Sequence, residues 1–79
     1  MDQRIFEQKL SVEGTSLYLM MSALSDQGAS LRRETMLSIW NASPDKLDTA
    51  LEELAGRGIA APQPGGPWAL LPFDQWRPA

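Results

Sequence analysis

The repeat of apolar positions is clearest between Ser43 and Ile59, where its spacing predicts a helix. Ser43 is typical of an N-cap, and Pro44 suits the first helical position because its missing N–H would have no partner there. Gly58 fits the left-handed residue just past a helix end, which would fold Ile59 back onto Leu54. Five apolar residues recur at i, i+3, i+4, i+7 and i+8, which places them on one helix face. They are Leu47, Ala50, Leu51, Leu54 and Ala55.

Two further helices are predicted before this one. The first begins at Ser11 or Thr15 and ends before Gly28. Its core positions follow the helical repeat and are Leu17, Met20, Met21 and Leu24. The second covers roughly residues 32–40, after a short extended link at residues 29–31, and its predicted buried side comprises Met36, Ile39 and Trp40. A tight turn at residues 41–42 follows, and the indole N–H of Trp40 is expected to find an acceptor near it.

After Ile59 the pattern changes to one that predicts a β-hairpin. Two short strands, at 59–62 and 67–71, flank a segment rich in Pro and Gly. Gly65 and Gly66 can take the positive φ angles that hairpin turns need. The prolines restrict these strands to sheet edges.

The two ends of the chain leave alternatives open. Residues 1–10 form an arm, in which either Phe6 fills a groove of the domain or the arm supplies a dimer contact. Residues 72–79 form a tail, whose Phe73 and Trp76 either pack back on the domain or are an exposed hook for a partner. The predicted domain itself spans residues 11–71.

The composition excludes several kinds of catalytic and metal-binding site. A chain of 79 residues with 43% apolar residues and three Trp is expected to fold as one globular domain. The absence of Cys and His removes disulfides, a thiol nucleophile, an imidazole base and the usual zinc ligands. No phosphate-binding loop motif occurs, and the carboxylates fit a solvated helix face. We therefore expect a non-enzymatic protein without cofactor or metal, and, since no apolar run reaches about 20 residues, a cytoplasmic one.

The order of predicted elements resembles the winged helix-turn-helix family over about residues 11–71. Leu31 stands where that family has its first strand, and R-R-E-T-M-L-S-I-W is similar to its second helix. The third helix ends on the L-x-x-L-x-x-x-G-I pattern of a recognition helix. The resemblance implies an α+β, mainly α fold: a three-helix winged helix-turn-helix with a short C-terminal β-hairpin, the wing. It also implies that the third helix would enter a DNA major groove while the wing holds phosphates.

The charges argue against that DNA-binding role. The predicted solvent face of the third helix carries four acids and two bases, at Asp45, Lys46, Asp48, Thr49, Glu52, Glu53 and Arg57. Residues 58–73 contain no charged side chain, so the wing has no cation for a phosphate. The net charge of −3 is opposite in sign to that of most DNA-binding domains.

Two functional hypotheses follow. The first is a small regulatory or adaptor module that acts mainly through protein contacts, with an unidentified partner or a second copy of itself as a homodimer. Its candidate contact residues are Asp45, Asp48, Glu52, Trp68, Phe73 and Trp76. The alternative is a DNA-binding transcriptional regulator with phosphate contacts from Arg32, Arg33 and Lys46, which charge disfavours.

Overall fold

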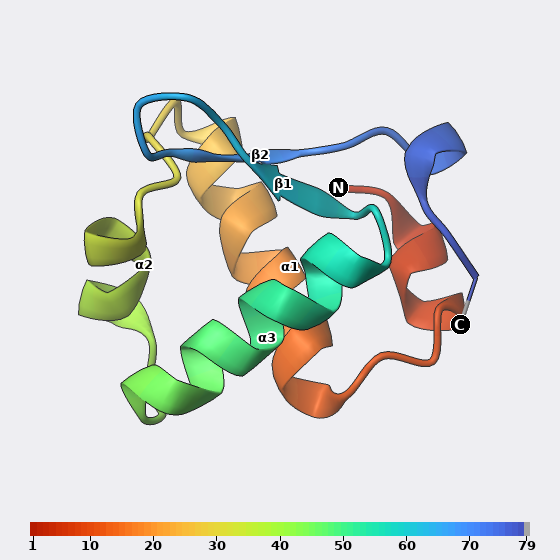
Figure 1. The fold of residues 1–79 in the computed structure, drawn as a ribbon, viewed down its shortest axis with the longest axis horizontal. Helices are drawn as coiled ribbons and strands as arrows, with labels where there is room; N and C mark the ends of the chain where they lie inside the picture. The colour runs from red at the N-terminus through yellow and green to blue at the C-terminus, as the bar shows by residue number, and fades with distance from the viewer. Residues whose placement is uncertain (79) are drawn as a thin grey trace.

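The computed structural model describes residues 1–78 and contains three helices followed by a two-stranded antiparallel hairpin (Figure 1). The helices are α1 (Val12–Asp26), α2 (Arg33–Ile39) and α3 (Pro44–Gly56), and the strands are β1 (Ala60–Pro62) and β2 (Trp68–Leu70). Short 3₁₀ helices at Gln3–Glu7 and Phe73–Gln75 lie in the arm and the tail. The predicted α+β, mainly helical fold class is therefore confirmed.

Helix α3 has the start and end that its sequence predicts. The Ser43 hydroxyl accepts a hydrogen bond from the Lys46 N–H at 3.3 Å. At the other end Gly58 has φ 68°, and the Ile59 N–H donates to the Leu54 carbonyl at 2.9 Å. The apolar face is buried, including Leu47 and Leu54 with no exposed surface.

Helix α1 begins at the earlier of its two predicted starts. Ser11 caps it by accepting from the Gly14 N–H at 3.0 Å. Gly14 is buried where α1 meets α3, and a Cβ at this position would collide with the Glu53 carboxylate. The glycine that weakens the first turn by propensity thus leaves room for the Glu53 carboxylate beside the start of α1. Leu17 and Met21 are fully buried, whereas Met20, predicted to be core, is only partly covered.

In helix α2 one residue predicted to be buried is exposed, and another is buried as predicted. Met36 is fully buried, but Ile39, predicted to be buried, is 52% exposed. The helix has only seven residues and ends at Ile39, and Met36 is its one buried residue. Trp40 is half-buried, and its indole N–H donates to the Ser43 carbonyl at 3.2 Å, as predicted.

The hairpin pairs Ala60 with Leu70 and Pro62 with Trp68, and its turn places Gly65 and Gly66 at φ 93° and 105°. The Trp68 N–H donates not to β1 but to the Leu31 carbonyl, at 2.8 Å. Leu31 is buried, so the predicted extended link is held against β2.

The core lies between α1, α3 and the hairpin, and the arm and tail close one end of it (Figure 1). The arm is anchored by Ile5, which is 1% exposed, and not by Phe6, which is 60% exposed. A single 3₁₀ turn presents only one of its side chains to the core, and here that residue is Ile5. Residue 79, the last of the predicted tail, lies outside the described residues.

None of the helices in residues 1–78 has the length and apolar character needed to span a bilayer.

Candidate docking surface

The outer face of α3 carries the residues that the sequence singles out for partner contact. Asp45, Lys46, Thr49 and Glu52 are exposed. The Thr49 hydroxyl donates to the Asp45 carbonyl at 2.9 Å, so it is occupied within the helix. Within residues 1–78, Lys46 forms no ion pair. The freely charged groups of this face are therefore two carboxylates and one ammonium.

Asp48 and Arg33, candidates for opposite functions, neutralise each other. Arg33 Nε lies 2.8 Å from Asp48 Oδ1, and Arg33 Nη2 lies 3.0 Å from Asp48 Oδ2, which is a bidentate pair. The side-chain hydrogen bond from Arg33 lowers the pKa of Asp48, and the carboxylate raises the pKa of Arg33. This pair joins α2 to α3 across the turn and leaves neither charge free for a ligand.

Arg32 holds the tip of the hairpin. Its Nη1 donates to the Gly65 carbonyl at 3.0 Å, although the side chain remains exposed. Of the three cations proposed for DNA phosphates, Arg33 is thus paired with a carboxylate, Arg32 bonds to a neutral carbonyl at the surface, and Lys46 forms no ion pair within residues 1–78.

Glu53 and Arg57 do not belong to the solvent face on which the sequence analysis placed them. The Glu53 carboxylate accepts from the Ser11 hydroxyl at 2.6 Å and from the Ser11 N–H at 3.0 Å. Arg57 donates to the carbonyls of Arg77 at 2.7 Å and Gln8 at 2.9 Å. Both lie three residues after a buried position of α3, at the border of the apolar face, and this spacing is the signal that could have identified them.

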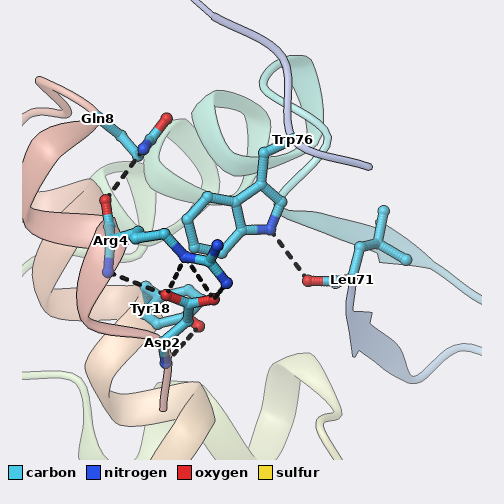
Figure 2. A network of polar contacts seen from close by, with 6 residues as sticks. All are labelled: Asp2, Arg4, Gln8, Tyr18, Leu71 and Trp76. Carbon is cyan, nitrogen blue, oxygen red and sulfur yellow. Dashed lines mark hydrogen bonds and ion pairs between the residues drawn. The ribbon is translucent and has the colours of Figure 1, made fainter. Parts of the chain in front are cut away.

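The aromatic candidates pack back on the domain. Trp68 and Trp76 are partly buried against the core. Trp76 donates its indole N–H to the Leu71 carbonyl at 3.0 Å and packs edge-on against Tyr18, with 5.8 Å between ring centroids (Figure 2). Phe73 is 37% exposed, and the Arg4 guanidinium carbon lies 3.7 Å from its ring centroid. Of the two tail aromatics, Trp76 packs back on the domain whereas Phe73 remains exposed, and partner contact through these rings stays a prediction.

An apolar groove, which the sequence analysis missed, adjoins the α3 face. Val12 and Ile39 are exposed by 78% and 52%, and with the half-buried Met20 and Trp40 they line a hollow of about 430 Å³. Glu13 lines both this groove and a smaller hollow beside Lys46 and Thr49. We call the α3 face and this groove together the docking surface. Val12, an apolar residue directly after the N-cap of α1, was the sequence feature that could have indicated this groove.

Residues 1–78 contain no group of three acidic, His or Cys side chains arranged to hold a metal ion.

Comparison with known proteins yields no matching family model, no matching curated protein and no matching solved structure. The resemblance to winged helix-turn-helix domains therefore stays a prediction from the sequence pattern.

Proposed function

We propose that this chain is a non-enzymatic docking module of the winged-helix type that acts mainly through protein contacts. The observation that carries the proposal is the internal use of its cations. Arg32, Arg33 and Arg57 donate to Gly65, Asp48 and the two end segments, respectively. Nonspecific DNA affinity depends on free Lys and Arg side chains that displace counterions, and the α3 face offers only Lys46.

The docking surface favours a partner with a defined chemistry. Glu13 lines the groove, and the exposed carboxylates of Asp45 and Glu52 lie on the neighbouring outer face of α3. A basic segment with one or two large apolar side chains would match both the charge and the groove, since interface centres are apolar and their rims polar. Exposed apolar side chains that line one hollow are a more specific signal than isolated ones.

The first experiment measures DNA binding by fluorescence anisotropy with a mixed-sequence duplex of about 30 base pairs at low salt. Wild-type protein is expected to show no saturable binding. The double variant Asp45→Lys/Glu52→Lys is expected to gain salt-dependent binding, because it adds two free cations to α3. Salt-dependent wild-type binding that weakens in Arg32→Ala would support the alternative, a DNA-binding regulator, and overturn our proposal.

The second experiment tests protein contact directly. A photo-cross-linking amino acid at Ile39, inside the groove, is expected to yield a discrete protein adduct in cells of the source organism. The same group at Gln27, exposed at the far end of α1, is the matched control. The adduct should disappear in the Asp45→Lys/Glu52→Lys background, and equal yields from both positions would argue against this surface.

A further inference from the structure

Helix α1 presents a polar stripe to a cleft on the side of the molecule formed by the end of β2 and the tail. Tyr18, Ser22, Ser25 and Asp26 follow at i, i+4, i+7 and i+8, so they share one helix face. All four line a cleft of about 380 Å³, which is within the size range of ligand sites. Tyr18 and Ser22 are 4% and 5% exposed, whereas Ser25 and Asp26 are exposed, so the stripe runs from a buried end to a solvent-facing end.

One side chain of the stripe has no partner in the protein. The Ser22 hydroxyl is buried and forms no hydrogen bond among the described residues. An unsatisfied buried hydroxyl costs free energy, and a polar ligand in the cleft would remove that cost. The Tyr18 hydroxyl accepts from the Asp2 N–H at 3.2 Å, which leaves its own proton available (Figure 2).

Aromatic rings form the opposite wall. Trp76 packs edge-on against both Tyr18 and Phe73, with interplanar angles of 84° and 63°. In edge-on pairs the edge of one ring covers part of the face of its neighbour, and the ring surface that remains uncovered can contact an alkyl chain. The Arg4 guanidinium over Phe73 shows that a cation already occupies one aromatic face at this corner.

The charged side chains of the lining are both carboxylates, Asp2 and Asp26, and no Lys or Arg side chain lines the cleft. Met1, which carries the amino group of the chain, lines it on the side of Asp2. Asp2 is matched by Arg4, whose hydrogen bonds hold the pKa of that carboxyl at about 2, and the amino group of Met1 adds a minor effect. Asp26 forms no ion pair and no side-chain hydrogen bond within residues 1–78. It is also the last residue of α1, where the helix dipole favours a cation.

We propose that this cleft binds an alkylammonium group, either a free amine or a lysine side chain. The ammonium pairs with Asp26, donates to the Ser22 hydroxyl, and places its alkyl chain against Trp76 and Tyr18. This site lies away from the docking surface on α3, so the inference does not depend on the proposed function.

The test is a titration with butylammonium followed by ¹H–¹⁵N NMR, with butanol as the neutral match. Butylammonium is expected to shift the Trp76 indole N–H and the amides of Ser22 and Asp26 in a saturable manner, while butanol is not. Equal shifts from both compounds, or no shift from either, would overturn the proposal. A blocked Gly-Lys-Gly peptide and its norleucine analogue then distinguish a lysine side chain from a free amine as the natural ligand.

Variants test the assigned groups. Asp26→Asn is expected to weaken butylammonium binding about two- to fivefold, because the ion pair at this exposed carboxylate is lost. Glu34→Gln, at an exposed acid on α2 outside the cleft, is the control and is expected to bind normally. Ser22→Ala should bind more weakly yet unfold at the same or a higher temperature, since its hydroxyl has no partner to lose. Identical affinities for Asp26→Asn and Glu34→Gln would refute the assignment.

Discussion

Replacing Glu53 by Ala should destabilise the domain by removing the polar link between α3 and the start of α1. The Glu53 carboxylate accepts two hydrogen bonds from Ser11, at 2.6 and 3.0 Å, and Ser11 in turn caps α1. Hydrogen bonds to a charged group contribute about 1.5–3 kcal/mol each when buried, and less at the partly exposed site here. We expect a loss of about 1–2 kcal/mol in the free energy of unfolding, measured by urea denaturation with tryptophan fluorescence. For a domain of this size each kcal/mol corresponds to about 4–8 °C in Tm.

The neighbouring Glu52 provides the control. It is exposed and forms no side-chain hydrogen bond within residues 1–78, so Glu52→Ala is expected to change stability by less than about 0.5 kcal/mol. A double-mutant cycle between Ser11→Ala and Glu53→Ala should give a coupling energy of about 0.5–1.5 kcal/mol. If Glu52→Ala and Glu53→Ala were equally stable, or the two sites were additive, the carboxylate would not join the two helices.

Three further predictions concern the core, a helix end and an ion pair. Leu51→Ala should cost about 2–5 kcal/mol in urea denaturation, since Leu51 is buried on α3, and retained stability would refute the helical phase. Gly58→Ala should cost more than about 1 kcal/mol because φ is 68° and the new Cβ would lie 2.5 Å from a tail carbonyl, whereas Gly56→Ala, with open space around it, should be neutral or stabilising. Asp48→Asn should lower the urea midpoint at neutral pH, and this deficit should vanish at low pH. The pKa of Asp48 is below its ordinary 3.8 in the folded state, so its stabilising effect is present above that value and is lost as pH falls through the folded pKa. A deficit that persists at pH values below the folded-state pKa of Asp48 would show that Arg33 is not its cause.

The parts of the fold that local chemistry determines could be predicted from the sequence. The ends of α3 depend on a capping hydroxyl, a first-turn proline and a left-handed glycine, all within a few residues of the helix. The same applies to the hairpin turn at Gly65 and Gly66. Ile39 was placed wrongly, and Phe6 does not fill the groove that one of the two alternatives for the arm gave it. Both residues lie in elements of two turns or fewer, where periodicity cannot select the buried side chain.

The docking surface was only partly predictable for a different reason. Its acidic residues are visible in the sequence, but which charges remain free depends on contacts between distant segments, such as Arg57 with Gln8 and Arg33 with Asp48. A helix pattern gives the direction of a side chain and not its partner. The polar stripe of α1, in contrast, has regular spacing from Tyr18 to Asp26 and could have been recognised among the apolar positions.

The contact between the two end segments has a consequence for rearranging the chain. Arg57 bonds to both Gln8 and Arg77, and Arg4 stacks on Phe73, so the arm and tail lie side by side (Figure 1). A short linker between them, with a new opening at the exposed hairpin tip near Pro64, would give a circular permutant that retains all three helices in order. In the permuted protein the hairpin tip would carry the new chain ends, and the arm and the tail would be joined covalently.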